Sequence, residues 1–151
     1  MVVEKRGDVF AELHAGRMLL HQVNCVGVMG AGIAAQVRKR FPDCYDAYKR
    51  ICSKDCLGKI YVHDCGAIKI CNAFGQQGIS RTTRMTDYIA WQSILQALIA
   101  ELDRLQQLGQ IWTVVAPYGI GCGLGGGSWP TMFDMLKGAF TKHELIICRF
   151  G

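Results

Sequence analysis

The chain contains two segments in which a strand-like run leads through glycines into the start of a helix, and this repeated arrangement restricts the fold most. One of them, Pro117 to Pro130, reads PYGIGCGLGGGSWP and holds six of the eighteen glycines. It follows the β-branched run 111–116 and contains Ser128 and Pro130, residue types that commonly begin a helix. Unpaired amides and the positive end of the helix dipole converge at such a point. The segment therefore predicts an anion site.

The other segment, Asn24 to Gly32, reads NCVGVMGAG and lies between a strand predicted over 17–24 and a helix predicted over 31–41. One diphosphate would satisfy both anion sites. Dinucleotide binding is an alternative, because Gly121 to Gly126 matches G-x-G-x-x-G, but that pattern belongs to the first βαβ unit of its fold. Neither segment has a Walker lysine, which excludes a P-loop. Each loop taken alone is also compatible with an ordinary connection.

The rest of the chain alternates between strand-like and helix-like segments. The clearest helix covers 86–108, where apolar residues recur at spacings of three and four and Gly109 supplies the C-terminal stop. A turn is expected at Asp64 to Gly66. Further helices are predicted over 43–51 and 128–142, and further strands over 59–63, 67–72, 111–116 and 144–150. This alternation predicts an α/β sheet covered by helices on both faces.

Composition limits the class of protein. A chain of 151 residues with 50% hydrophobic content fits one domain over residues 1–151. The N-terminus is charged where a signal peptide is apolar, and no apolar run reaches the roughly 18 residues of a membrane span. We therefore expect a cytoplasmic protein without a membrane partner. The sequence contains no signal for an oligomeric state.

Cysteine and charge give weaker signals. The eight cysteines are scattered through strand-like and helix-like segments, which favours reduced thiols. Cys52 and Cys56 have a usable spacing for zinc, but a second tight pair is missing, so we predict no metal. The net charge of +5 includes one cluster at 38–40, which a helix C-terminus would favour. It suits a phosphate-bearing ligand and falls short of a nucleic-acid footprint.

Three motifs together resemble those of the macrodomain family. They are Val23 to Ala34 (VNCVGVMGAGIA), Gly119 to Leu124 (GIGCGL) and Arg6 to Phe10 (RGDVF), and they span nearly the whole chain. The similarity is to the subgroup with terminal ADP-ribose protein glycohydrolases and ADP-ribose-1''-phosphate phosphatases. It implies a three-layer α/β/α sandwich with a mixed, mostly parallel sheet. It also implies ADP-ribose as ligand, with its diphosphate between the two glycine segments, and no cofactor.

The resemblance also assigns ligand-binding residues. Asp8, followed by Val9, corresponds to the aspartate that accepts from the adenine amino group, and Asn24 to the asparagine beside the distal ribose. Phe150 is the candidate for stacking on adenine, because Cys148 stands where many relatives have a tyrosine. Two alternatives stay open: Asp8 as a helix N-cap or turn residue, and Asn24 as a loop asparagine bonded to its own backbone. The diphosphate cradle comprises Gly30, Ala31, Gly32, Ile33, Gly119, Ile120, Gly121, Cys122, Gly123 and Leu124.

The resemblance is weakest at the catalytic residues. Related hydrolases use a lysine within the segment corresponding to 72–84 and an aspartate where this chain has Gly125, and neither is present. Direct attack by water held by Asn24, with His21 or Asp87 as acid or base, is the remaining route. His21 is alternatively a strand histidine bonded to a neighbour.

Two function classes follow from these residues. The first is a hydrolase that removes ADP-ribose from a modified protein or nucleic acid, or cleaves a derivatised ADP-ribose. The second is a non-catalytic ADP-ribose-binding module. An RNA or poly-adenylate binder is a weaker reading, because aromatic and basic residues are not interleaved along the sequence. The polar loop with Gln76, Gln77 and Arg84 is the expected determinant of substrate selection.

Overall fold

A single six-stranded sheet forms the centre of the molecule, as seen in a computed structural model that describes residues 1–80 and 82–150. The strand order is β1-β6-β5-β2-β4-β3. The strands are β1 (Val2–Arg6), β2 (Arg17–Asn24), β3 (Ile60–Asp64), β4 (Lys69–Gln76), β5 (Thr113–Pro117) and β6 (Leu145–Arg149). The helices are α1 (Val9–Glu12), α2 (Gly32–Arg40), α3 (Pro42–Ile51), α4 (Tyr88–Gln107) and α5 (Trp129–Ala139).

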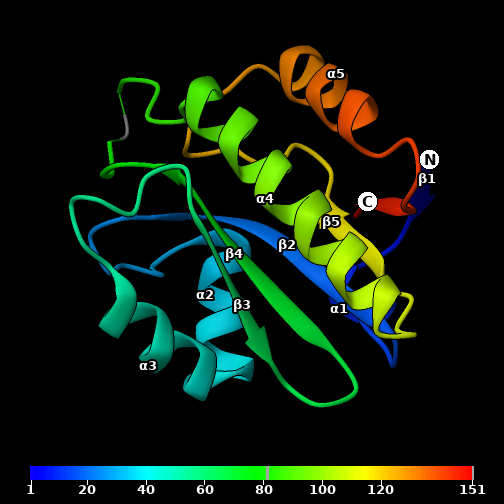
Figure 1. Cartoon of the computed structure of the whole chain (residues 1–151). Helices are drawn as coiled ribbons and strands as arrows, with labels where there is room; N and C mark the ends of the chain where they lie inside the picture. The colour runs from blue at the N-terminus through cyan, green and yellow to red at the C-terminus, as the bar shows by residue number, and fades with distance from the viewer. Residues whose placement is uncertain (81, 151) are drawn as a thin grey trace.

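The sheet is mixed and mostly parallel. The pairs β1–β6, β6–β5, β5–β2 and β2–β4 are parallel, and only β3 runs antiparallel, next to β4. Helices α4 and α5 cover the face turned to the viewer in Figure 1, and α2 and α3 lie behind the sheet. The predicted three-layer α/β/α sandwich is therefore confirmed, and the carboxyl ends of five parallel strands meet at one edge.

The core has one apolar cluster on each face of the sheet, and β2 contributes to both. Leu20 packs in the cluster that contains Trp91 of α4, whereas Leu19 packs in the cluster that contains Tyr48 of α3. Both leucines are fully buried. A strand buried on both faces is apolar at successive positions, as β2 is at Met18, Leu19 and Leu20, and this run made the strand predictable.

The N-terminal strand and the short helix after it were not predicted. In β1 only Val2 is partly buried, and the other four residues are exposed. An edge strand needs little apolar surface, because its backbone hydrogen bonds to β6 hold it in place. Helix α1 is a single turn, too short to show a helical period in the sequence.

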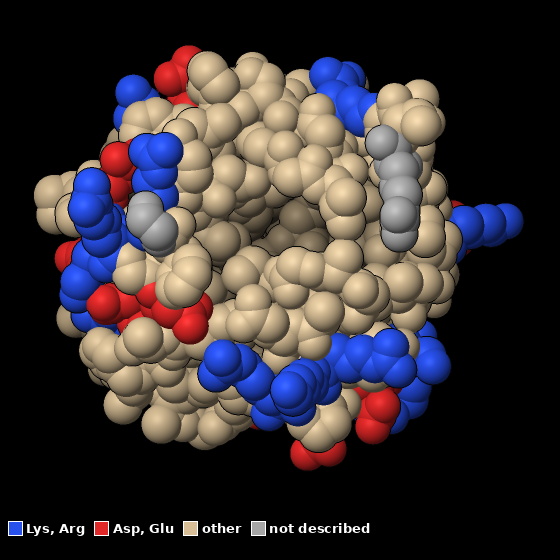
Figure 2. All heavy atoms as spheres, turned by 180° about the vertical axis from the view of Figure 1, so that it is seen from behind, with Lys and Arg blue, Asp and Glu red and all other residues tan. Residues whose placement is uncertain are grey.

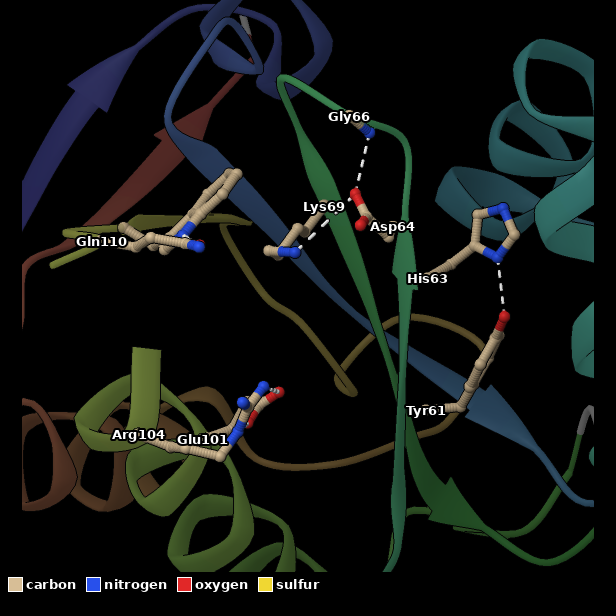
Figure 3. A network of polar contacts seen from close by, with 9 residues as sticks. Tyr61, His63, Asp64, Gly66, Lys69, Glu101, Arg104 and Gln110 are labelled. Carbon is tan, nitrogen blue, oxygen red and sulfur yellow. Dashed lines mark hydrogen bonds and ion pairs between the residues drawn. The ribbon is translucent and has the colours of Figure 1, made fainter. Parts of the chain in front are cut away.

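The turn between β3 and β4 is confirmed where the sequence predicts it. The backbone N–H of Gly66 donates to Asp64 Oδ1 at 2.8 Å, and Lys69 Nζ lies 3.7 Å from the same oxygen (Figure 3). Lys69 is the first residue of β4, a strand of eight residues. At about 3.3 Å per residue, its Cα is roughly 20 Å from the carboxyl end of that strand. This lysine is therefore remote from the edge that carries the glycine segments.

Three chain-wide features complete the description. Among the described residues, no helix is long and apolar enough to cross a membrane. All eight cysteines are free thiols. No group of three or more His, Cys, Asp and Glu side chains within residues 1–80 and 82–150 is arranged to hold a metal ion.

Candidate functional site at the carboxyl edge of the sheet

The predicted ligand-binding segments follow neighbouring strands at the carboxyl edge. In sheet order the edge carries Asp8 after β1, Phe150 after β6, residues 118–128 after β5 and residues 25–31 after β2. We call residues 25–31 the first glycine loop and residues 118–128 the second glycine loop. Three strand spacings of about 4.8 Å separate β1 from β2, so these positions span about 14 Å. In α/β sheets ligands bind at such an edge, outside the carboxyl ends of the strands.

The first glycine loop is shaped by Asn24, the last residue of β2. Asn24 Oδ1 accepts from the backbone N–H groups of Val26 and Val28, both at 3.2 Å, and Asn24 Nδ2 donates to the Val28 carbonyl at 2.8 Å. The Tyr48 hydroxyl on α3 lies 2.8 Å from Asn24 Oδ1 and 2.7 Å from the Asn24 carbonyl. Asn24 is 7% exposed. Its side chain therefore holds the loop, as the loop-asparagine alternative described.

The rest of the first glycine loop offers free backbone donors. The N–H groups of Met29, Gly30, Ala31 and Gly32 have no hydrogen-bond partner among the described residues. Helix α2 begins here at Gly32, with Ala31 as an N-cap that provides no side-chain cap. Gly32 has a φ of 58°, a left-handed conformation that favours glycine. The loop thus presents uncapped amides at a helix N-terminus, which is the chemistry of an anion site.

The second glycine loop packs against a partly buried polar network. Trp91 Nε1 donates to Gln22 Oε1 at 2.6 Å, and Gln22 Nε2 donates to Gln76 Oε1 at 2.7 Å and to Thr86 Oγ1 at 2.9 Å. Thr86 Oγ1 in turn donates to the Gly121 carbonyl at 2.6 Å. The network therefore connects β2, β4, the start of α4 and the second glycine loop.

Gly125 is the residue that allows this close approach. A Cβ at Gly125 would lie 2.8 Å from Gln22 Nε2 and 2.9 Å from the Gly121 carbonyl, and would also overlap Thr86 Oγ1. The Gly125 carbonyl accepts from the N–H groups of Met85 and Thr86 at 2.9 and 3.0 Å. An aspartate has no room here, which gives a physical reason for glycine at the position where the family resemblance implies an aspartate.

The opposite side of the second glycine loop is open. The backbone N–H groups of Gly121, Gly123 and Leu124 have no hydrogen-bond partner in the part of the chain that the structure describes. A Cβ at Gly123 would meet nothing within 4 Å, and Leu124 is 64% exposed. The predicted cradle residues Gly119, Ile120, Gly121 and Cys122 belong to the same turn, in which Ile120 alone is buried. The two glycine loops therefore present free amides after adjacent strands.

The predicted adenine end is assembled from β1 and β6. Asp8 is the N-cap of α1, and its Oδ1 accepts from the Phe10 N–H at 3.1 Å, so the N-cap alternative is realised. No protein donor within the described residues reaches Asp8 Oδ2. Val9 is buried in the core behind it, and Phe150 is 83% exposed beyond β6. Asp8 and Phe150 thus follow paired strands, with Gly7 N–H donating to the Arg149 carbonyl at 3.0 Å.

His21 does not lie at this edge, which corrects the prediction of a catalytic histidine. It is 1% exposed and three residues before the end of β2, where Nε2 lies 2.7 Å from Asn72 Oδ1. Burial lowers the pKa of His21 to about 4, so the ring is neutral at neutral pH. Being neutral and enclosed, it has no path to a ligand. The strand-histidine alternative is the correct one.

Asp87 is the N-cap of α4, and its Oδ1 accepts from the Ala90 N–H at 3.0 Å. It lines a hollow of about 390 Å³ together with Arg84, Met85, Thr86, Tyr88 and Ile89. A larger hollow, about 630 Å³, lies between α4 and α5 and receives no residue from either glycine loop. Thr86, the residue before Asp87, contacts the second glycine loop, so Asp87 lies near that loop. One oxygen of the Asp87 carboxylate is used to cap α4.

The side of the molecule behind the sheet in Figure 1 is hollowed near its centre. Uncharged residues surround this hollow, and Lys and Arg side chains lie around its margin (Figure 2). Thiols near the glycine loops are neutral, because burial raises the pKa of Cys25 to about 12 and also raises the pKa of Cys122. Backbone amides and neutral side chains, with cations at a distance, suit a ligand with its own negative charge.

Sequence reasoning missed the residues that support the loops. Tyr48, Gln22 and Thr86 come from three separate segments and meet only in the folded sheet. The one available signal was in β2, where Gln22 interrupts an apolar run on the face that packs against α4. A polar residue on the inward face of such a strand normally has a hydrogen-bond partner, and Gln22, which is partly buried, has three.

Comparisons with known proteins agree with this geometry. No protein-family model matches the sequence. The chain is 32% identical over 126 residues to a DNA ADP-ribosyl glycohydrolase of Mycobacterium tuberculosis, an alignment that covers 82% of this chain and 35% of that protein. It is 42% identical over 50 residues to an ADP-ribose 1''-phosphate phosphatase of Meyerozyma guilliermondii, covering 32% of this chain and 29% of the relative. The chain thus spans about a third of the length of these relatives.

A solved structure extends the match to the whole fold. The macrodomain of Mycobacterium tuberculosis DarG superposes with a TM-score of 0.78 at 28% identity, covering 98% of this chain and 97% of that one. The fold and the paired glycine loops define an α/β/α domain with free backbone amides at one edge of its sheet. The chain belongs to the macrodomain family, as the three sequence motifs predicted.

Proposed function

We propose that this chain binds ADP-ribose along the carboxyl edge of its sheet and hydrolyses the bond between ADP-ribose and a modified macromolecule. The observation that carries the proposal is the pair of glycine loops with free amides after the adjacent strands β2 and β5. A diphosphate placed between them accepts hydrogen bonds from both. Adenine then extends toward Asp8 and Phe150, and the distal ribose toward Asn24.

The relatives support the hydrolase assignment. One is named a DNA ADP-ribosyl glycohydrolase and another an ADP-ribose 1''-phosphate phosphatase, and both names describe hydrolysis at the distal ribose. ADP-ribosylated nucleic acid is the first candidate substrate, and ADP-ribosylated protein and a derivatised ADP-ribose are the others. A cytoplasmic location, as expected from the sequence, belongs to the same proposal.

The proposed chemistry is direct attack by water. Lys69 pairs with Asp64 at the far end of β4, and residues 72–84 contain no lysine, so we expect no covalent sugar adduct on Lys69 or on that segment. Asn24 has one amide hydrogen left beyond its bond to Val28, and this hydrogen would orient water or the ribose. Asp87 is a candidate base through the carboxylate oxygen that does not cap α4.

A non-catalytic binding module is the second candidate function. It is favoured by Gly125, because an acidic side chain cannot be accommodated there, and by His21, because its ring is enclosed in the sheet. These positions leave few groups for acid–base chemistry, while the amides that would hold the diphosphate are unaffected.

Calorimetric titration with ADP-ribose, ADP, NAD and oligo-adenylate tests the binding site. ADP-ribose should bind, and Gly123→Glu should abolish binding in a folded protein, because its carboxylate would occupy and repel the phosphate position. Unaltered binding by Gly123→Glu would contradict the proposed cradle.

Incubation with nucleic-acid-linked, protein-linked and 1''-phosphorylated ADP-ribose then tests turnover. Asn24→Ala should slow release on the order of a hundredfold, whereas Lys69→Ala should not. A protein adduct trapped by borohydride would exclude direct water attack. If none of the three substrates is turned over, the binding module is the function.

The adenine assignment has its own test. Asp8→Ala should weaken ADP-ribose binding by about 1.5–3 kcal/mol, because the adenine amino group would lose a charged acceptor. Asp8→Ser keeps a side-chain oxygen that caps α1 and removes the charge. If Asp8→Ser binds ADP-ribose as well as the parent does, Asp8 serves only as the N-cap.

A further inference from the structure

A tyrosine with two cations over its ring lies on the outer side of the first glycine loop. Arg38 of α2 places its guanidinium carbon 4.4 Å from the centre of the Tyr45 ring, and Lys49 Nζ lies 5.4 Å from the same centre. We call Arg38, Tyr45 and Lys49 the α2–α3 cation cluster. The cluster is not apparent in the sequence, because Arg38 lies in α2 whereas Tyr45 and Lys49 lie in α3.

The cluster is continuous with the candidate site. The Tyr45 hydroxyl donates to the Gly27 carbonyl at 3.5 Å, and a Cβ at Gly27 would lie 3.9 Å from Lys49 Cγ. Gly27 belongs to the first glycine loop, which Asn24 shapes. With the distal ribose beside Asn24, as proposed, a group attached to it would pass near Gly27 and Lys49.

The cations of this surface are available for a ligand. Arg38, Lys39, Arg40, Lys49 and Arg50 are exposed, and none of them forms an ion pair with any residue in 1–80 or 82–150. Asp43 and Asp46 are the acidic residues of the same two helices, so the positive charge is in excess. In Figure 2, Lys and Arg form a row below the hollow, in the part of the molecule that holds α2 and α3.

We propose that the α2–α3 cation cluster binds the sugar-phosphate backbone of the nucleic acid strand that carries the ADP-ribose. This inference rests on the proposed function and assigns the surface outside the ADP-ribose site that would hold the strand. Exposed cations without ion-pair partners beside the first glycine loop match the regular negative charge of a nucleic acid backbone.

The test uses a single-stranded DNA 12-mer with one ADP-ribosylated base, the same 12-mer unmodified, an ADP-ribosylated peptide and free ADP-ribose. Binding of each is measured at several salt concentrations for the parent and for Arg38→Gln/Lys49→Gln. The control variant is Lys137→Gln on α5, because Lys137 also lies over a ring, 4.9 Å from the centre of Phe133, on the other face of the sheet.

The double variant should bind the modified 12-mer about fivefold to tenfold more weakly and free ADP-ribose equally well. Its slope of log affinity against log salt should fall by about 1.4, since each single-strand phosphate contact contributes about 0.7. Lys137→Gln should match the parent in both.

An unchanged salt slope in the double variant would overturn the proposal. So would an equal loss of affinity for the modified peptide, because the surface would then recognise protein. If the parent binds the unmodified 12-mer but not free ADP-ribose, the proposed function fails instead, and with it the assignment of this surface to an ADP-ribosylated strand.

Discussion

The first glycine loop is shaped by the side chains around it, whereas the second is shaped by its own glycines and by a polar network beneath it. In the first, Asn24 and Tyr48 hold the backbone through their side chains. In the second, Gly125 permits a close approach to Gln22 and Thr86. Similar strand–glycine–helix patterns can thus depend on different residues, and substitutions should separate the two loops.

The largest effect is expected at Gly125. Gly125→Ala would place a methyl group against Gln22 and Thr86, so we expect the free energy of unfolding to fall by about 3 kcal/mol. Affinity for ADP-ribose should fall more than tenfold, because the free amides of the second loop would move. Denaturant unfolding and calorimetry measure the two quantities.

Gly123→Ala is the matched control for this substitution. Both glycines lie in the second glycine loop, but a Cβ at Gly123 meets open space. If the two alanine variants behave alike, close packing does not shape the second loop, and the comparison of the loops fails.

Asn24→Ala should have the next largest effect, on the first loop alone. It leaves the N–H groups of Val26 and Val28 without their acceptor, while the Tyr48 hydroxyl keeps the Asn24 carbonyl, and we expect a loss of about 2.5 kcal/mol in the free energy of unfolding. Asn24→Asp retains an acceptor and should lose less stability. Equal losses for the two variants would mean that the acceptor oxygen does not hold the loop.

Some features of the fold and of the two loops could be predicted from the sequence and others could not, for a physical reason. Strands β2 to β6, α4 and the glycine segments were predictable, because apolar period, β-branched runs and glycine are local signals. Asp8 and Asn24, which the family resemblance assigned to the ligand, both follow strands at the carboxyl edge of the sheet. The predicted catalytic role of His21 was wrong, because no local sequence pattern shows that its ring contacts Asn72 on another strand. Tyr48, Thr86 and Lys49 depend on the packing of distant segments, which no local pattern records.

Acidification should lower the free energy of unfolding through His21, which lies in β2, the strand before the first glycine loop. Burial lowers the pKa of His21 to about 4 from 6.5, so the unfolded chain binds the proton more readily than the folded one. Stability is therefore full above pH 6.5 and is lost as the pH falls toward 4. Between pH 7.5 and 5 we expect a loss of about 2 kcal/mol in the free energy of unfolding.

Urea unfolding at several pH values tests this loss. Glu12, Asp64 and Glu101 have lowered pKa values because of their hydrogen bonds, and the stability they contribute is lost only at lower pH. His21→Gln should remove most of the pH dependence above pH 5, whereas His14→Gln, at an exposed position, should retain it. An unchanged pH dependence in His21→Gln would exclude His21 as its cause.

The smallest effects come from Thr86→Val and Tyr48→Phe, which each remove one hydroxyl group beneath one loop. Thr86→Val deletes the bond to the Gly121 carbonyl and Tyr48→Phe the bonds to Asn24, and each should lower the free energy of unfolding by about 1 kcal/mol. Because the two hydroxyls share no partner, their effects should add to within about 0.4 kcal/mol. In the free energy of ADP-ribose binding, the effects of the two substitutions should not add, because one diphosphate would contact both loops. Additive effects in binding as well as in stability would show that the loops do not share a ligand.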